Sequence, residues 1–113
     1  MQWHVIEARI RYLLPNEGGR KSGVFSGYRG QFFYDGDDYD GFQLFPNQPT
    51  QLVELGTEVR AFVQFSETRW QQVHRHKLRD GMPFEIREGS RTVGIGKVTR
   101  LDVAEAEWAH LLS

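Results

Sequence analysis

The feature that most constrains this chain is a strict alternation of side chains near its N-terminus. Six residues share one face of the chain if it is extended there: His4, Ile6, Ala8, Ile10, Tyr12 and Leu14. The opposite face carries Glu7, Arg9 and Arg11, with Val5 and Leu13 at its two ends. Because successive side chains of a strand point to opposite faces, this pattern predicts a half-buried β-strand over residues 4–14.

Five more segments have the composition and length of short strands. They cover residues 31–34, 41–45, 58–65, 83–88 and 91–101. Turns rich in glycine and proline separate them, and we interpret the acidic run at residues 35–40 as a further solvated turn. Six short strands at this spacing predict an all-β protein, built as a small antiparallel barrel or sandwich.

Two segments have helical features instead. Thr68 and Gln71 have the spacing of a capping box, and Gly81 marks a C-terminal stop for the helix that they begin. Residues 103–113 are rich in Ala, Glu and Leu, which predicts a C-terminal helix. With 113 residues and no internal repeat or linker, we expect one domain over residues 1–113.

Charge and composition exclude several classes of function. The formal net charge is −1, from 14 basic and 15 acidic residues, so no bulk attraction draws the chain to nucleic acid or anionic lipid. There is no cysteine, which excludes disulfides and thiolate metal sites. The start lacks the order of a signal peptide, and the longest uncharged stretch, residues 41–53, contains two prolines. We expect a soluble, cytoplasmic protein that does not enter a membrane.

No catalytic or cofactor motif is complete. Residues 19–22 interrupt the order of a phosphate-binding loop, and the acidic run at residues 35–40 lacks the ligand spacing of a calcium loop. His74 and His76 have no third ligand at a telling spacing, so we interpret them as histidines of a basic surface stretch. We expect no catalytic residue, no metal, no cofactor and no bound nucleotide, and therefore no enzyme.

One stretch of the chain carries a binding signal. Four positive charges fall within eleven positions, at Arg69, Arg75, Lys77 and Arg79, and they alternate with aromatic and histidine residues. Four aspartates lie elsewhere, within residues 35–40. We expect this segregation of charge to leave a basic patch suited to phosphate groups. The alternative is an ordinary solvated helix face.

Two longer motifs resemble the third, C-terminal domain of elongation factor Tu. Residues 17–20 read EGGR, and Gly27-Tyr28-Arg29 with Gln31-Phe32 follow, similar to the EGGR and GYRPQF segments of that family. Residues 84–98 are similar to its FxIREGGRTVGxGxV ending. The resemblance covers residues 4 to about 101, with both motifs in the expected order. It implies a six-stranded antiparallel β-barrel, to which the sequence pattern adds one or two short helices.

The resemblance also implies which positions face a partner. In the factor, this domain performs no chemistry, packs on the GTPase domain, contacts the T arm of aminoacyl-tRNA and takes part in binding the nucleotide-exchange factor. The tRNA-facing positions it implies here are Arg20 and Lys21 in the first loop, with Glu88 and Gly89 in the last hairpin. No GTPase or middle domain precedes Met1 in this sequence, so we expect no GTP-driven delivery by this chain alone.

Two functions stay open at this point. The first is a non-catalytic module that binds tRNA, other RNA or a translation protein, through the six cations Arg20, Lys21, Arg69, Arg75, Lys77 and Arg79. The second is a protein–protein interaction module that mimics, regulates or neutralises a partner protein without binding RNA. The acidic run at residues 35–40, where the resembling domain has a basic turn, favours the second. The sequence leaves the oligomeric state open.

Overall fold

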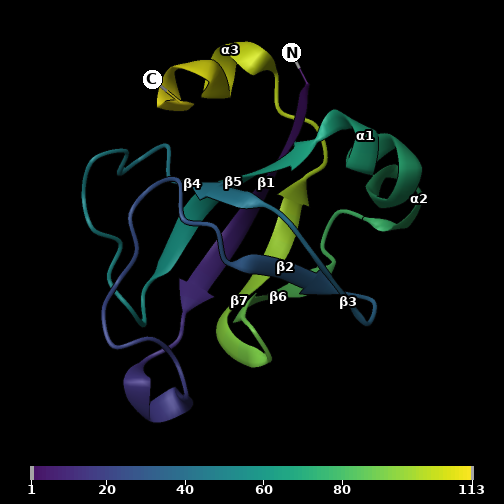
Figure 1. Cartoon of the computed structure of the whole chain (residues 1–113). Helices are drawn as coiled ribbons and strands as arrows, with labels where there is room; N and C mark the ends of the chain where they lie inside the picture. The colour runs from purple at the N-terminus through teal and green to yellow at the C-terminus, as the bar shows by residue number, and fades with distance from the viewer. Residues whose placement is uncertain (1, 113) are drawn as a thin grey trace.

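The strands of this chain form one curled antiparallel sheet that closes into a half-barrel (Figure 1). The computed structural model describes residues 2–112, and within them the sheet has seven strands in the order β3-β2-β6-β7-β1-β5-β4. Their bounds are β1 Trp3–Tyr12, β2 Gln31–Tyr34, β3 Asp37–Tyr39, β4 Phe42–Leu44, β5 Glu58–Ser66, β6 Pro83–Glu88 and β7 Arg91–Arg100. The predicted all-β fold is confirmed, but the predicted count of six strands is wrong.

The additional strand lies inside the acidic run that we interpreted as a turn. Asp35 and Gly36 have φ values of 51° and 82°, the two positive angles that a two-residue hairpin loop requires. The chain then returns along β2, and Tyr34 pairs with Asp37. Aspartate is depleted in strands, so its density here conceals β3 from composition alone. Only the Asp35-Gly36 dipeptide indicates a hairpin.

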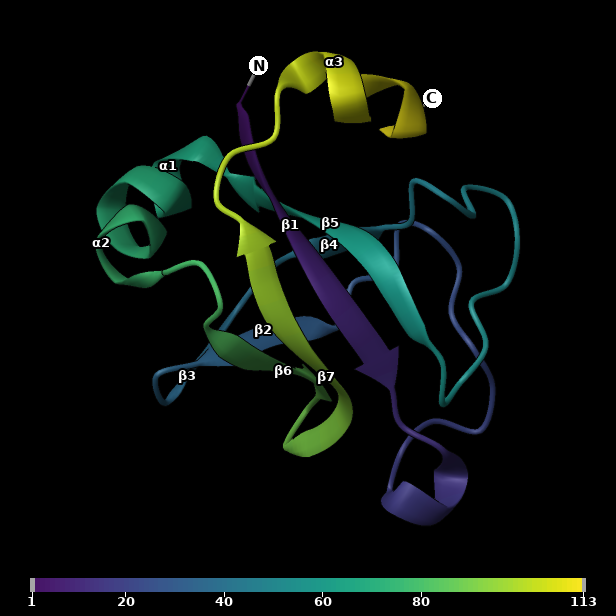
Figure 2. The same cartoon turned by 180° about the vertical axis from the view of Figure 1, so that it is seen from behind.

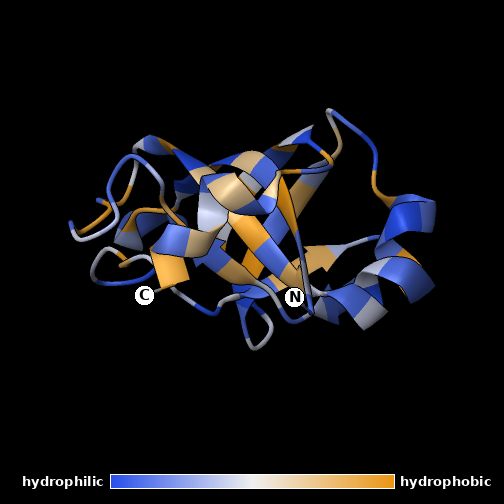
Figure 3. Ribbon diagram, turned by 90° about the horizontal axis from the view of Figure 1, so that it is seen from above, coloured by the Kyte–Doolittle hydropathy of each residue, from blue (hydrophilic) through white to orange (hydrophobic). Residues whose placement is uncertain are grey.

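The core lies on the concave side of the sheet, where the predicted alternation is fulfilled. Ile6, Ala8 and Ile10 of β1 are completely buried. In the register they lie opposite Val63, Ala61 and Val59 of β5, which are buried as well. Hydrophobic and hydrophilic residues alternate along the central strands in Figure 3. Leu14 was expected to continue this face, but it follows the end of β1 and is 40% exposed.

The C-terminal segment covers part of the outer face of the same sheet. It forms α3 (Glu105–Trp108) and η3 (Ala109–Leu112), which lie at one end of the sheet (Figure 2). Val103 and Trp108 pack with three buried sheet residues in a second apolar cluster: Val5, Leu44 and Phe62. The helix predicted from residue 103 thus begins at Glu105. Met1 and Ser113, at the ends of the predicted ranges, lie outside the described residues.

A second helical segment follows β5 without a break. It consists of α1 (Glu67–Arg69), the π-type turn η2 (Trp70–His74) and α2 (Arg75–Lys77), and we call it the basic helix. Its N-cap is Ser66, whose Oγ accepts a hydrogen bond from the Arg69 N–H at 3.1 Å, rather than the predicted Thr68. The short η1 (Pro15–Glu17) follows β1. No helix within residues 2–112 has the length and apolar character that crossing a membrane requires.

We expect the substitution Trp108→Ala to lower the free energy of unfolding by about 3–5 kcal/mol, because it removes a buried ring and leaves a cavity. Trp108 is only 3% exposed, whereas Leu112 in the same segment is 44% exposed. Leu112→Ala is therefore the control, with an expected loss of about 0.5 kcal/mol or less. Urea denaturation measures both values. Equal stability of the two variants would mean that the segment does not pack on the sheet.

Candidate binding surfaces

The first candidate surface joins the loop after η1 to the hairpin between β6 and β7. Arg20 forms an ion pair with Glu88, and the Tyr28 hydroxyl donates a hydrogen bond to the same carboxylate. Arg91 adds a contact of 3.3 Å between its Nη2 and Glu88 Oε1. The Arg20 guanidinium also lies 5.1 Å from the centre of the Tyr28 ring. Two segments that are 68 positions apart in the sequence are thus held together.

Glu88 compensates the charge of Arg20 in this contact. Burial by itself raises the pKa of Glu88, but the hydrogen bonds from Tyr28 and Arg20 outweigh it and hold the pKa below its usual value. Burial, together with the Glu88 charge, raises the pKa of Tyr28 far above its usual value, so its proton stays on the hydroxyl. Arg20 is therefore oriented and neutralised by Glu88.

Two further cations at this surface stay accessible to a partner. Lys21 is exposed, and 57% of the Arg91 side chain is accessible. Gly89 has a φ of 63° at the first position of the two-residue turn, and a Cβ built on it would meet open space. We call Arg20, Lys21, Glu88, Gly89 and Arg91 the hairpin surface. Its first four members are the positions that the resemblance implied, and Arg91 is added by the structure.

The second candidate surface is the predicted basic patch. Its four cations lie on or just after the basic helix, far from the hairpin surface in both views (Figures 1 and 2): Arg69, Arg75, Lys77 and Arg79. The expected segregation of charge is wrong here. The Lys77 Nζ lies 3.1 Å from Asp35 Oδ2, and the hydrogen bond to that carboxylate raises the pKa of Lys77. Arg69 lies over the ring of Tyr39, at 5.6 Å. The β2–β3 hairpin therefore packs its aspartates and rings beside the cations.

Arg75 and Arg79 differ from Lys77 and Arg69, because they contact neither an acidic side chain nor an aromatic ring of the described residues. Their guanidinium groups donate to backbone oxygens, Arg75 to Gln71 at 3.2 Å and Arg79 to Leu78 at 2.8 Å. Neither forms an ion pair with an acidic residue in the described part of the chain. With Arg69, whose contact is an aromatic ring, three of the four predicted cations are thus without an ion pair among the described residues, and only Lys77 is paired.

His74 corrects the interpretation of the two histidines as surface residues. It is completely buried, with its Nδ1 2.7 Å from the Tyr34 hydroxyl and its ring 4.2 Å from that of Phe65. Trp70, His74 and Leu78 recur every four residues, which places them on one face of the helix, and this spacing was the signal in the sequence. Within residues 2–112, no three histidine, aspartate or glutamate side chains are grouped to hold a metal.

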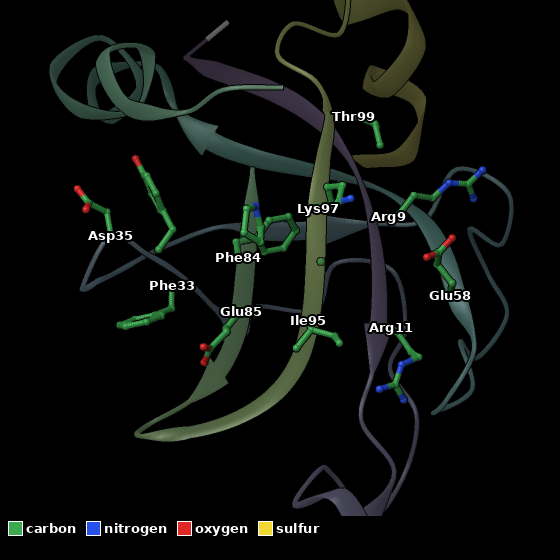
Figure 4. Close-up of a pocket in the computed structure, with 13 residues that line it drawn as sticks. Arg9, Arg11, Phe33, Asp35, Glu58, Phe84, Glu85, Ile95, Lys97 and Thr99 are labelled. Carbon is green, nitrogen blue, oxygen red and sulfur yellow. The ribbon is translucent and has the colours of Figure 1, made fainter. Parts of the chain in front are cut away.

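A groove of about 660 Å³ crosses the outer face of β6, β7 and β1, and sequence reasoning missed it (Figure 4). Phe33 and Ile95 supply its apolar surface, and Ile95 is 44% exposed. Arg9 and Lys97 line it as cations, and Glu85 lines it as an anion. An exposed isoleucine in a strand was the available signal, but a single such residue is common on protein surfaces.

The part of the chain that carries the sheet, the basic helix and the hairpin surface matches a known protein family. The family model of the elongation factor Tu C-terminal domain matches residues 2–102. This range holds the seven strands, the basic helix and the whole hairpin surface, whereas α3 and η3 lie beyond it.

We expect stability to fall as the pH is lowered from 7 to 5, because His74 must stay neutral in the folded chain. Burial, followed by the charge of Arg69, lowers the pKa of His74 to about 4. An unfolded histidine has a pKa of about 6.5, so only the unfolded state gains a proton in this range. The His74 contribution is complete above pH 6.5 and decreases by about 2 kcal/mol between pH 7 and pH 5.

Urea denaturation of His74→Gln at both pH values measures this effect. We expect the variant to lose most of the pH dependence, whatever its absolute stability. The exposed His76 provides the control, because His76→Gln should keep the wild-type dependence. Ion-paired carboxylates such as Glu7 and Glu17, whose pKa values are lowered, titrate at more acidic pH. An unchanged dependence in His74→Gln would contradict the assignment.

Proposed function

Because the chain belongs to the elongation factor Tu C-terminal domain family, we propose that it is a non-catalytic binding module of the translation apparatus whose hairpin surface binds RNA. The observation that carries this proposal is the ion pair between Arg20 and Glu88. It joins the two segments whose counterparts face tRNA in the resembling domain. It also brings the loop that carries Lys21 to the hairpin that carries Gly89 and Arg91, so that two cations can meet neighbouring phosphates.

The chemistry of the hairpin surface suits a sugar–phosphate backbone. Gly89 has no side chain, so a ribose can approach the turn closely. Lys21 and Arg91 supply charge, and Glu88 holds Arg20 in place and can accept a hydrogen bond from a 2′-hydroxyl. With a net charge of −1 on the chain, binding depends on this local arrangement.

We expect the chain to bind tRNA at low salt and to release it steeply as salt rises. Each phosphate that a cation neutralises lowers the logarithm of the affinity by about 0.7–0.9 for each tenfold increase in salt. Titration of labelled tRNA by fluorescence anisotropy at two salt concentrations measures the slope. We expect the double variant Lys21→Ala/Arg91→Ala to weaken binding and to reduce the slope by about 1.5.

The matched control is Arg75→Ala/Arg79→Ala, on and just after the basic helix. It removes the same number of positive charges from the chain, so any bulk effect of net charge is equal in the two variants. We expect this control to keep the wild-type affinity. Equal weakening in both variants would indicate diffuse attraction, and absence of tRNA binding at low salt would refute RNA binding by the hairpin surface.

A second candidate function, capture of a partner protein, is favoured by the groove over β6, β7 and β1 (Figure 4). It combines accessible apolar side chains, Phe33 and Ile95, with charged residues around them, as the apolar core and polar rim of a protein–protein interface do. The pairing of Lys77 with Asp35, which reduces the charge of the basic helix, favours this candidate too.

If this second function holds, the chain should retain a protein from nuclease-treated lysate, and Ile95→Asp should abolish the capture while Lys21→Ala/Arg91→Ala keeps it. The reason is that a carboxylate at position 95, directly opposite Glu85 in the sheet, disrupts the apolar contact and adds repulsion. Mass spectrometry of the retained proteins, compared between the variants, measures the outcome. If nuclease treatment abolishes the retention of proteins, they are held through RNA, and RNA binding is favoured instead.

A further inference from the structure

A smaller pocket opens on the outer face of β4 and β5, beside the start of the basic helix. It has a volume of about 330 Å³, and Phe42, Gln64 and Arg69 are among its lining residues. Small-molecule sites occupy roughly 300–1,000 Å³, so this pocket accommodates one compact ligand. None of its lining residues belongs to the hairpin surface or to the groove in Figure 4.

Gln64 is the unusual member of this pocket. Its side chain is only 3% exposed, and its Nε2 has no hydrogen-bond partner within residues 2–112. In the sheet it lies between Val5 and Phe42, where an apolar side chain would fit the surroundings better. A buried amide N–H without a partner costs free energy, and folded proteins keep few of them. The oxygen atom of a ligand would supply the missing acceptor.

Aromatic rings and unpaired cations surround this amide. The Arg29 guanidinium lies 4.9 Å from the centre of the Phe42 ring, and the Trp3 ring meets Phe42 edge-on at 6.0 Å. Neither Arg29 nor Arg69 forms an ion pair with an acidic side chain of the described chain. Aromatic and guanidinium planes stack on nucleobases, and free guanidinium groups bind phosphate.

Asp40 limits the charge that the pocket tolerates. Its carboxylate lines the same pocket and forms no ion pair within residues 2–112. Together with Arg29 and Arg69 it leaves one net positive charge, which suits a ligand with a single phosphate rather than a chain of them. A carboxylate also accepts hydrogen bonds from the N–H groups of a base.

We infer that this pocket binds one nucleotide unit, either as a free nucleoside monophosphate or as an unpaired nucleotide of RNA. The base stacks on the Trp3 or the Phe42 ring, whose planes lie 83° apart, and a base carbonyl accepts a hydrogen bond from Gln64 Nε2. The phosphate lies between Arg29 and Arg69. This site goes beyond the proposed function, because the hairpin surface contacts only the sugar–phosphate backbone.

Isothermal titration calorimetry of the full chain with uridine and guanosine 5′-monophosphates tests the inference. We expect at least one of them to bind, and its nucleoside without phosphate to bind about tenfold more weakly or worse, because the charged contacts are lost. A parallel titration with hexauridylate distinguishes an RNA strand from a free nucleotide as the natural ligand. Tighter binding of hexauridylate indicates an RNA strand as the natural ligand, and equal or weaker binding indicates a free nucleotide.

The substitution Gln64→Met has two expected effects of opposite kind. It should weaken nucleotide binding about tenfold or more and, because it removes an unsatisfied amide, raise the urea midpoint of unfolding. The matched control is Gln43→Met, at a glutamine that is also fully buried. The Gln43 amide donates to Gly30 and Gly41 at 3.0 and 3.1 Å, so its loss should lower the midpoint.

Three results would overturn the inference. The first is the absence of binding by both monophosphates and by hexauridylate. The second is binding of inorganic phosphate as tight as that of the monophosphates, which would reduce the pocket to an anion site. The third is nucleotide binding unchanged by Gln64→Met, or a lowered midpoint in that variant. The variant Lys21→Ala/Arg91→Ala should leave monophosphate binding intact, which separates this test from that of the hairpin surface.

Discussion

The rest of the structure depends on the pairing of β1 with β5 on one side and β7 on the other. β1 lies inside the strand order, between β7 and β5, and its inward side chains Ile6, Ala8 and Ile10 are completely buried. A slip of one residue in either pairing would turn these side chains to the outside and place Glu7 and Arg9 in the core. The register is therefore strongly specified by the hydrophobic pattern, and every surface described above takes its position from it.

The outer side of the same sheet is used in two different ways. Over β1, β4 and β5, the C-terminal segment buries Trp108 against Val5 and Phe62. This segment lies beyond the family match. Over β6 and β7, no described segment covers the sheet to the same extent, and Ile95 stays exposed in the groove. The inner face of the sheet is buried in the core, so the outer face needs a covering segment only where it is apolar as well. The position of the C-terminal segment follows from that need.

Charge in this molecule is matched locally rather than separated into large fields. Glu88 balances Arg20 at one end of the sheet, and Asp35 pairs with Lys77 at the other. Glu7 accepts hydrogen bonds from both Arg60 and Arg100 on the central strands. The cations that remain unpaired, such as Arg29 and Arg75, are consequently the informative ones. Where they adjoin an exposed ring or a buried amide, a ligand of matching chemistry gains the most.

The sequence by itself determined six of the seven strands, the inward face of β1 and the family, because alternation and two long motifs are local properties of the chain. It also indicated Arg20 and Glu88 as members of one site, through the resemblance. Only the tertiary structure decided that Asp35 neutralises Lys77, that His74 is buried and that Gln64 lies unpaired in a pocket. Those outcomes depend on which distant segments the curled sheet brings together, and no spacing within a single segment records such contacts.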